Sequence, residues 1–240
     1  MRDKLLGVIG GMGPLATQLF YKMIIEKTNA HKDQEHIDMI ILNHASMPDR
    51  TKAIFDGAED ELLEHLEEDA DFLEKGGAEY VAIPCNTCHV LVDRLQNKTD
   101  LKIINMINVT VDHVKALYGS GCKVGIMATD GTVKMGLYQK ECEAKGLVPI
   151  IPSTANQKIV MKIIYEGIKD GSPIDLSEFK KVEDQFRKED CDCVIMACTE
   201  LSCFKEMYNL PEYFVDAMEV MACKAITLCG KKIKETKNDQ

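Results

Sequence analysis

The sequence contains no apolar run that approaches the roughly 20 residues needed for a membrane-spanning helix. The apolar stretch from Leu5 to Ile9 is also too short for the core of a secretory signal, and it leads directly into glycines. A composition of 45% hydrophobic and 28% charged residues is ordinary for a soluble globular protein. These features predict a cytoplasmic protein of 240 residues that has no membrane partner.

Basic residues are too few for a nucleic-acid-binding protein. The chain has 29 Lys and Arg against 39 Asp and Glu, a formal net charge of -10. This charge repels polyphosphate, and no basic stripe is interleaved with aromatic residues. Nucleic acid is therefore excluded as a partner. An acidic small molecule is not excluded, because a few cations inside a pocket can reverse the potential locally.

Signatures of disulfides and of zinc sites are missing as well. The ten cysteines occur without an export signal, so we expect reduced thiols. None of the cysteines crowded between residues 191 and 203 has the C-x-x-C spacing typical of zinc sites, although a metal remains an alternative there. Cys191 and Cys193 flank a predicted strand whose side chains alternate between its two faces, and Cys193 is expected to point into the core. Packing roles are predicted for Cys122, Cys142, Cys223 and Cys229.

Short β-rich apolar runs alternate with amphipathic stretches, which predicts an α/β fold with parallel sheets. The expected strands are Leu5–Ile9, Asp38–Leu42, Tyr80–Ile83, Lys102–Ile104, Lys123–Met127, Val148–Ile151, Cys193–Met196 and Tyr213–Val215. The expected helices are Leu15–Thr28, Asp60–Lys75, Ile159–Ile168, Phe179–Arg187 and Val220–Lys232.

A near-repetition links the two halves of the chain. The segments EYVAIPCNT, which contains Cys85, and DCVIMACTE, which contains Cys198, both read as a strand, a small residue, a cysteine and then a threonine. Ligands of open parallel sheets bind beyond the carboxyl ends of the strands. We therefore expect two similar lobes whose thiols face one cleft. The first lobe would span residues 1–105 and the second 106–215, with a C-terminal helix, 216–240, returning to the first.

The glycine-rich segment from Gly10 to Ala16 follows a predicted strand and opens a predicted helix, a position where backbone amides can meet an anion. It fits the dinucleotide fingerprint only loosely, because the second strand ends at Leu42 and Asn43 without the acid that would hold a ribose. A carboxylate is favoured over a pyrophosphate. A purely structural tight turn remains an alternative.

In the segment from Pro84 to Thr87, polar groups directly follow a thiol at a strand end, where they can stabilise a thiolate or hold a carboxylate. A buried structural cysteine is the alternative. Cys85, Cys88 and His89 also have the spacing of a c-type haem attachment site, which we reject because that attachment follows export. A redox pair of Cys85 and Cys88 remains open.

Five motifs together resemble the cofactor-independent aspartate/glutamate racemase superfamily, and within it the aspartate racemase branch. They are GGMGPLAT (residues 10–17), MPDRT (47–51), PCNTCH (84–89), ATDGT (128–132) and ACTEL (197–201), and the resemblance runs from about residue 5 to about residue 230. It implies two flavodoxin-like α/β lobes with the active site between them, often a homodimer, and no cofactor.

The same resemblance implies roles for eight residues. Cys85 and Cys198 would be the catalytic pair. Met12, Asn86, Thr87 and Thr199 would surround the α-carboxylate, and Arg50 and Lys169 would hold the side-chain carboxylate. The chain departs from the common pattern at Cys88, where a small residue is usual, and at Met196 and Ala197, where glycine is frequent.

We therefore expect an amino-acid racemase that acts on aspartate or possibly glutamate. Racemisation needs two acid–base groups on opposite sides of Cα, one thiolate and one thiol. Arg50 offers a fork that suits a second carboxylate, although a surface salt bridge to Asp49 or Glu59 is its alternative. The rival functions are a dicarboxylate isomerase in which one cysteine attacks covalently, a noncatalytic amino-acid or metal sensor, and a dinucleotide-binding protein.

Overall fold

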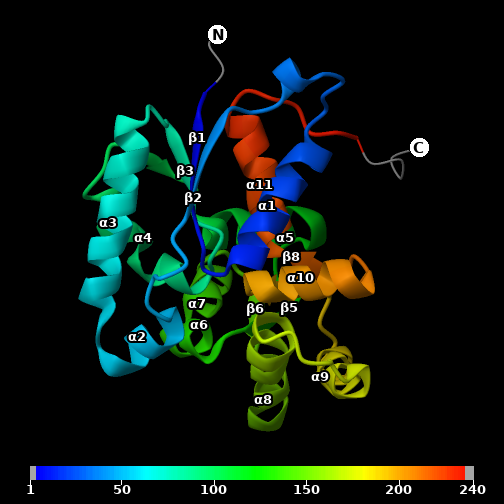
Figure 1. Ribbon diagram of the computed structural model, residues 1–240. Coiled ribbons are helices and arrows are strands. Elements are labelled where there is room, and N and C mark those ends of the chain that lie inside the picture. The colour runs from blue at the N-terminus through cyan, green and yellow to red at the C-terminus, as the bar shows by residue number, and fades with distance from the viewer. Residues whose placement is uncertain (1–3, 236–240) are drawn as a thin grey trace.

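The computed structural model describes residues 4–235, and within them it contains two four-stranded parallel sheets (Figure 1). The strand orders are β2-β1-β3-β4 and β6-β5-β7-β8, so the second half of the chain repeats the topology of the first. The strands are β1 Leu6–Gly10, β2 Met39–Asn43, β3 Tyr80–Ala82, β4 Lys102–Ile103, β5 Lys123–Ala128, β6 Val148–Ile150, β7 Cys193–Ala197 and β8 Phe214–Asp216. The predicted α/β fold with two parallel-sheet lobes is confirmed.

Helices cover both sheets. They are α1 Pro14–Lys27, α2 Arg50–Asp56, α3 Glu59–Lys75, α4 Val92–Gln96, α5 Met106–Tyr118, α6 Asp130–Met135, α7 Leu137–Ala144, α8 Thr154–Lys162, α9 Leu176–Lys188, α10 Thr199–Tyr208 and α11 Ala217–Leu228, with 3-10 turns η1 Asp33–Glu35 and η2 Thr87–Leu91 and a π-helix η3 Ile163–Lys169. The single helix expected over Ile159–Ile168 is thus the end of α8 continued by η3.

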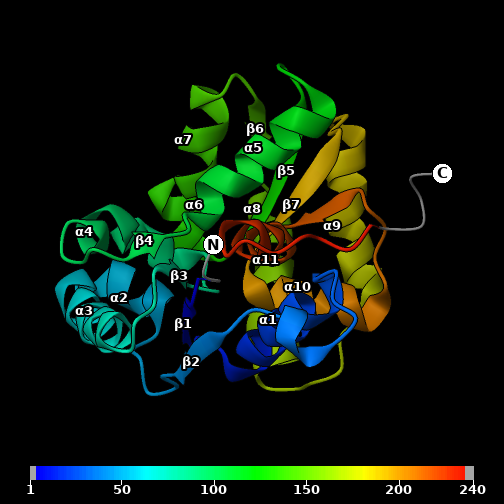
Figure 2. The same ribbon diagram turned by 90° about the horizontal axis from the view of Figure 1, so that it is seen from above.

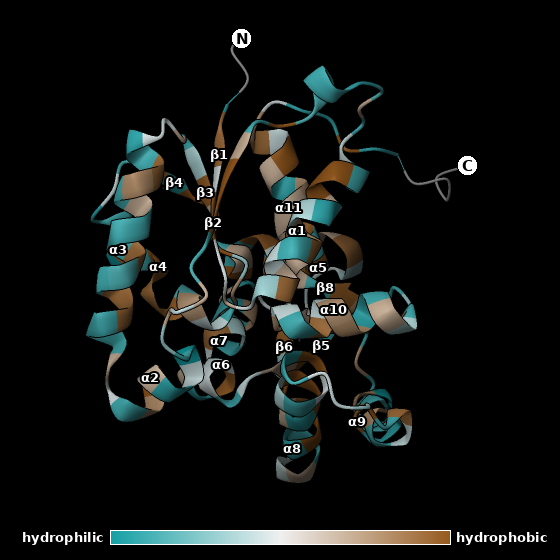
Figure 3. Cartoon of the chain, in the orientation of Figure 1, coloured by the Kyte–Doolittle hydropathy of each residue, from teal (hydrophilic) through white to brown (hydrophobic). Residues whose placement is uncertain are grey.

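The strands at the centre of each sheet are buried, apart from Lys123 at the start of β5, because helices pack on both of their faces. Every residue of β1 and of β7 is buried, as parallel sheets of α/β proteins require. The helix α3 buries its leucine stripe, including Leu62, Leu66 and Leu73, against this core and turns its acidic face outward. In Figure 3 the visible side of α3 is accordingly mostly hydrophilic.

The last helix, α11, lies near the middle of the molecule when it is seen from above (Figure 2). It contacts α1 and β3 on the side of the first sheet, and α5 and β7 on the side of the second. This helix therefore touches elements of both halves. The lobe boundaries expected at residues 105 and 215 stay a prediction, and residues 236–240 of the expected C-terminal segment lie outside the described residues.

The topology brings four segments to one end of the two sheets. Met12 follows β1 and Cys85 follows β3, while Thr129 follows β5 and Cys198 follows β7. In each sheet these are the two neighbouring central strands, between which the strand order reverses and where open α/β sheets bind their ligands. None of the helices described between residues 4 and 235 combines the length and the apolar character needed to cross a bilayer.

Candidate active site

Both cysteines of the repeated segments open onto one small cavity. Its volume is about 20 Å³, and Cys85 and Cys198 are each only 5% exposed. All eight residues expected at the site line this cavity, together with five that were not expected. The full lining is Met12, Asp49, Arg50, Thr51, Cys85, Asn86, Thr87, Thr129, Tyr165, Lys169, Cys198, Thr199 and Glu200.

The loop that carries Cys85 is clamped by a buried histidine. The Nε2 atom of His89 accepts a hydrogen bond from the backbone N–H of Met106 at 3.0 Å, so its Nδ1 carries the proton and donates to the carbonyl of Cys85 at 2.9 Å. Burial lowers the pKa of His89, which keeps the ring neutral in this role. The backbone of Cys85 is thereby fixed at the end of β3.

The surroundings of Cys85 favour its thiolate. The pKa of Cys85 is lowered to about 6, first by the neighbouring Cys88 and next by the positive charge of Arg50, while burial opposes the change. Since an unperturbed cysteine titrates near 8.5, this thiol is largely ionised at neutral pH.

Cys198 has the opposite character. Its Sγ donates a hydrogen bond to Oε2 of Glu200 at 2.9 Å. Burial, and next the negative charge of Glu200, raise the pKa of Cys198 well above its ordinary value. The surroundings therefore favour the thiolate at Cys85 and the thiol at Cys198.

Glu200 is a buried carboxylate that we did not predict at the site. Its Oε1 lies 3.6 Å from Nζ of Lys169, and a Cβ built on Gly13 would lie 3.6 Å from the same oxygen. This places the carboxylate near the N-terminus of α1, where the helix dipole favours negative charge.

The glycine segment itself forms a tight turn. The N–H of Gly11 is taken by Oγ1 of Thr17 at 2.8 Å. Gly11 has a φ of 89°, and a Cβ there would lie 2.5 Å from the backbone of His44. Of this segment, only Met12 lines the cavity, so the anion expected at its amides finds no free donor at Gly11.

Asn86 presents an unused hydrogen-bond donor. Its Oδ1 accepts from the hydroxyl of Tyr138 at 2.5 Å, whereas its buried Nδ2 has no partner among residues 4–235. Beside it, the hydroxyls of Thr87, Thr129 and Thr132 lie within 3.0 to 3.1 Å of one another. A buried amide donor without a partner is costly, so this wall of the cavity suits a carboxylate that would accept from it.

The two expected cations also reach the cavity. Arg50 is buried, not on the surface, and its guanidinium donates to the carbonyls of Pro48 at 2.9 Å and Met47 at 3.5 Å, so the surface salt bridge considered for it is wrong. Burial disfavours its charge, but the neighbouring Cys85 and Cys88 raise the pKa of Arg50.

Lys169 comes from η3, in the second half of the chain. Its Nζ lies 3.9 Å from Oδ2 of Asp49 and 4.6 Å from the ring centre of Tyr165, whose hydroxyl donates to the same Asp49 oxygen at 3.2 Å. Asp49 is the N-cap of α2, so these contacts tie the first half of the chain to the second across the cavity. A π-helix is a rare element that is frequent at functional sites.

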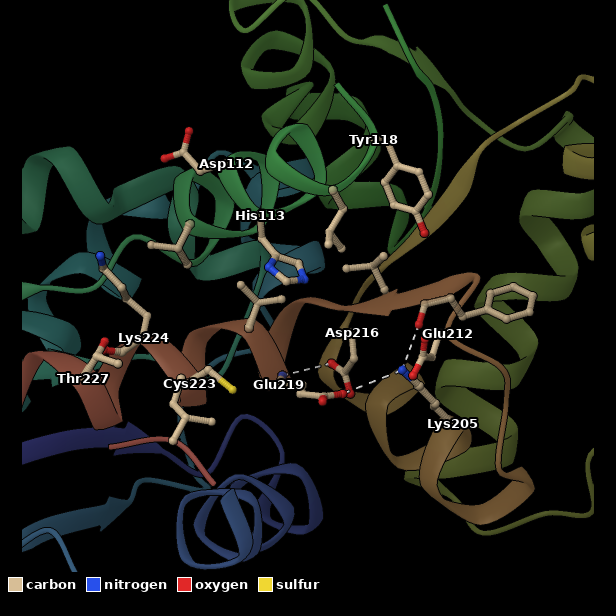
Figure 4. Close-up of a pocket in the computed structure, with 16 residues that line it drawn as sticks. Asp112, His113, Tyr118, Lys205, Glu212, Asp216, Glu219, Cys223, Lys224 and Thr227 are labelled. Carbon is tan, nitrogen blue, oxygen red and sulfur yellow. Dashed lines mark hydrogen bonds and ion pairs between the residues drawn. The ribbon is translucent and has the colours of Figure 1, made fainter. Parts of the chain in front are cut away.

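A larger hollow lies between α5, β8 and α11 and contains neither Cys85 nor Cys198 (Figure 4). Several of its charged groups already have partners. Lys205 donates to the carbonyl of Phe214 at 2.8 Å and pairs with Glu219 at 3.7 Å, and Asp216 caps α11. This hollow offers no acid–base pair comparable to the two cysteines.

All ten cysteines are free thiols, Cys85 and Cys88 among them. Between residues 4 and 235, no three His, Cys, Asp or Glu side chains are arranged to hold a metal ion. Cys193 is fully buried in β7, as expected of a core residue.

The family model described as Asp/Glu/Hydantoin racemase matches residues 9–225, a range that includes every residue of the cavity. The chain belongs to this family. It is therefore an isomerase. The chain is 23% identical over 229 residues to the broad specificity amino-acid racemase RacX of Bacillus subtilis, covering 93% of this chain and 97% of that one.

Solved structures show the same relationship. The aspartate racemase of Picrophilus torridus is 29% identical and superposes with a TM-score of 0.84, covering 96% of both chains. An aspartate racemase homologue from Pyrococcus horikoshii is 26% identical with a TM-score of 0.75, covering 95% of this racemase and 99% of that chain. By sequence alone, a glutamate racemase of Desulforudis audaxviator is 28% identical over 145 residues, covering 60% of this chain and 52% of its own.

The lining residues missed from the sequence carried signals that could have found most of them. Glu200 directly follows Cys198 and Thr199 in a quoted motif, and Thr129 lies in another. Tyr165 precedes Lys169 by one helical turn, so the two share a face. Asp49 and Thr51 flank Arg50 in a third quoted motif.

Proposed function

We propose that this racemase inverts Cα of an acidic amino acid, aspartate first and glutamate second, by a two-base mechanism without a cofactor. The observation that carries the proposal is that two cysteines line one cavity, in surroundings that lower the pKa of Cys85 and raise the pKa of Cys198. Inversion at carbon requires such a pair, one member to remove a proton and the other to return one to the opposite face.

In the proposed reaction, the Cys85 thiolate removes the α-proton of the enantiomer whose Cα–H faces it. The electron pair of the broken C–H bond moves into the carboxylate, which becomes an enediolate. Cys198 then gives its S–H proton to the other face of Cα. The enzyme ends with Cys85 as thiol and Cys198 as thiolate, and it returns to its resting form by exchanging protons with solvent or by running the reverse reaction.

The charge that develops on the carboxylate needs hydrogen-bond donors already in place. Nδ2 of Asn86 is buried in the cavity wall and has no partner among the described residues. The hydroxyls of Thr87 and Thr199 line the same cavity. We assign the α-carboxylate to these three side chains and to the wall formed by Met12.

A side-chain carboxylate is assigned to Arg50 and Lys169. Arginine presents a planar fork that matches a carboxylate, and both cations line the cavity. Lys169 already lies near Asp49 and Glu200, so an incoming carboxylate competes with these acids for it. Similarity to an aspartate racemase favours aspartate, while similarity to glutamate racemases and to a broad specificity racemase supports testing other amino acids.

The lowered pKa of Cys85 also suits a nucleophile, and this observation favours one rival, a dicarboxylate isomerase that acts by covalent attack. Intact-mass measurement of the protein after quenching with maleate distinguishes the two. An adduct of one substrate mass on Cys85 would support the isomerase. Unmodified protein, together with racemisation of an amino acid, supports the proposal.

The direct test is chiral chromatography after incubating the purified protein with each common amino acid. We expect the opposite enantiomer to accumulate with aspartate or glutamate, and the activity to be lost in Cys85→Ala and in Cys198→Ala. Cys223→Ala, a half-buried cysteine of α11 outside the cavity, is the matched control and should retain activity. Tight binding of an amino acid without any inversion would instead indicate a sensor.

Three further expectations accompany this proposal. We propose a cytoplasmic location, which suits ten reduced thiols and is tested by cell fractionation. We propose a homodimer, which light scattering on the purified protein tests. We also propose that the lobes meet near residue 105, with the C-terminal helix associated with the first lobe, which limited proteolysis tests.

A further inference from the structure

One oxygen of the Glu200 carboxylate has no hydrogen bond to any residue described between positions 4 and 235. Glu200 is 5% exposed and lines the cavity. Its Oε2 accepts from the thiol of Cys198 at 2.9 Å and from the hydroxyl of Thr199 at 3.5 Å. Its Oε1 is paired only with Nζ of Lys169, at 3.6 Å, which is too long for a hydrogen bond. Oε1 can therefore still accept from a ligand in the cavity.

The assignments proposed above leave one charged group of an acidic amino acid without a partner. The α-carboxylate is assigned to the wall around Asn86, and the side-chain carboxylate to Arg50 and Lys169, while the two thiols meet opposite faces of Cα. The α-ammonium remains. It carries a positive charge and three N–H donors, and a buried charge without a partner is costly. The cavity must therefore supply an acceptor for it.

Two carboxylates line the cavity, and they differ in what already occupies their oxygens. Oδ1 of Asp49 accepts from the backbone N–H of Lys52 at 2.8 Å, and Oδ2 accepts from the hydroxyl of Tyr165 at 3.2 Å. Both oxygens of Asp49 are thus engaged, whereas Oε1 of Glu200 is not. Glu200 also lies beside the thiol of Cys198. A substrate whose Cα meets this thiol brings its ammonium close to Glu200.

We propose that Glu200 binds the α-ammonium of the substrate through Oε1 and thereby selects amino acids over dicarboxylates that lack an amino group. The inference rests on the substrate assignment of the proposed function, an acidic amino acid held between the two thiols. Glu200 and Lys169 together match the two charges of a zwitterion. The carboxylate receives the ammonium, and the lysine receives the side-chain carboxylate.

Binding of an amino acid exchanges existing ion pairs for new ones. Nζ of Lys169 lies 3.6 Å from Glu200 and 3.9 Å from Asp49. An acidic amino acid brings a carboxylate for Lys169 and an ammonium for Glu200, so neither buried group is left alone. A plain dicarboxylate draws Lys169 away and brings no cation, which leaves the buried charge of Glu200 unpaired. The site therefore disfavours ligands without the ammonium.

The test is protection of Cys85 from iodoacetamide by three matched compounds, read at this residue by peptide mass spectrometry. L-Aspartate carries the ammonium, L-malate has a hydroxyl in its place, and succinate has only hydrogen there. We expect aspartate to protect the wild type at a concentration about tenfold or more below that of malate or succinate, as a hydrogen bond between charged groups contributes such a factor. Equal protection by aspartate and malate would overturn the inference, as would no protection by any of the three.

Glu200→Gln keeps the shape of the side chain and removes its charge. In this variant aspartate should lose most of its advantage, while succinate should protect at least as well as in the wild type. A purely structural defect would weaken all three compounds together, and that result counts against the inference. Glu206→Gln, an exposed change on the same helix, is the matched control and should keep the wild-type order.

Asp49→Asn tests the other carboxylate of the cavity. It keeps an oxygen for the N–H of Lys52, and the preference for aspartate over succinate should remain. Loss of the preference in Asp49→Asn, with the preference intact in Glu200→Gln, would assign the ammonium to Asp49 and overturn the inference. If Glu200→Gln does not fold, the comparison of aspartate with malate in the wild type decides the question.

The same measurements separate this inference from the proposed function. If the order of protection is as expected but neither aspartate nor glutamate is inverted, Glu200 holds an ammonium in a site that performs a different reaction. If aspartate is inverted and malate protects equally well, the function stands and the role of Glu200 is wrong. Where both hold, KM for aspartate at neutral pH should rise about tenfold in Glu200→Gln.

Discussion

The hydroxyl of Tyr138 lies 2.5 Å from Oδ1 of Asn86, a contact that joins a helix of the second half of the chain to the loop after β3. Tyr138 is fully buried, and burial raises its pKa, so the hydroxyl remains a donor. The nearby hydroxyl of Thr110 donates to the carbonyl of Met106 at 2.7 Å, which leaves the Tyr138 proton for Asn86. The amide of Asn86 is thereby oriented with Nδ2 left free for a ligand.

Replacing Tyr138 by Phe removes this one hydroxyl and keeps the ring. We expect kcat/KM for the racemised amino acid to fall about tenfold, mainly through a higher KM, because Asn86 loses its orientation and a hydrogen bond contributes on the order of 1 kcal/mol. Steady-state kinetics check this. Tyr21→Phe, on the exposed side of α1, is the control. Unchanged kinetics in a folded Tyr138→Phe protein would refute the role of the contact.

The pH profile of the wild type should be asymmetric. Cys85 must be ionised to act as base, and its pKa is lowered to about 6, so kcat/KM should rise as the pH increases through about 6 and then level off. Cys198 must stay protonated, and its raised pKa keeps it so past neutrality, which places the decline at alkaline pH. Initial rates in the direction that begins with Cys85 as base check both limbs. An acid limb near 8.5 would contradict the assignment.

Glu200→Gln removes the negative charge beside Cys198. Because Glu200 raises the pKa of Cys198, we expect this thiol to ionise at lower pH in the variant and the alkaline limb of the rate profile to move down accordingly. Alkylation of Cys198 at neutral pH should accelerate. Glu206→Gln, an exposed change on the same helix, should leave both measurements unaltered. If Cys198 alkylates no faster in Glu200→Gln, its protonation is set by burial alone.

Replacing Asp216, the N-cap of α11, should destabilise the protein. Asp216 accepts from the N–H of Met218 at 2.8 Å and from the hydroxyl of Ser202 at 2.7 Å, all of them buried (Figure 4 labels Asp216). Asp216→Ala should lower the free energy of unfolding by about 2 kcal/mol, measured by urea denaturation. Asp216→Asn, which keeps a capping oxygen, should lose much less. Asp175→Ala, at the exposed cap of α9, should cost less than Asp216→Ala.

The fold was largely predictable because its strands are buried on both faces and read as short β-rich runs. All eight expected strands are present within two residues of their predicted bounds. The helices α2, α4, α6 and α7 were missed because each has only five to eight residues, too few to show a helical period. The cap of α5 was a missed signal, since Asn105 accepts from the N–H groups of Ile107 and Asn108.

The candidate site was predictable where a motif lay beside a strand end, as for Cys85 and Cys198. The polar contacts between residues distant in the sequence were not predictable. No pattern in the sequence indicates that Tyr138, far from Asn86 along the chain, would orient its amide, or that Glu200 would lie near the start of α1. Such contacts depend on how the two halves pack together, which a local motif does not determine.

The most direct test of the two-base claim is solvent deuterium incorporation at Cα during the first turnovers in heavy water. Starting from either enantiomer of the racemised amino acid, the account predicts one deuterium in the product, delivered by the cysteine on the far face, while recovered substrate remains unlabelled at early times. Deuterium appearing in recovered substrate as fast as in product would show a single base. That result would contradict the assignment of Cys85 and Cys198 to opposite faces.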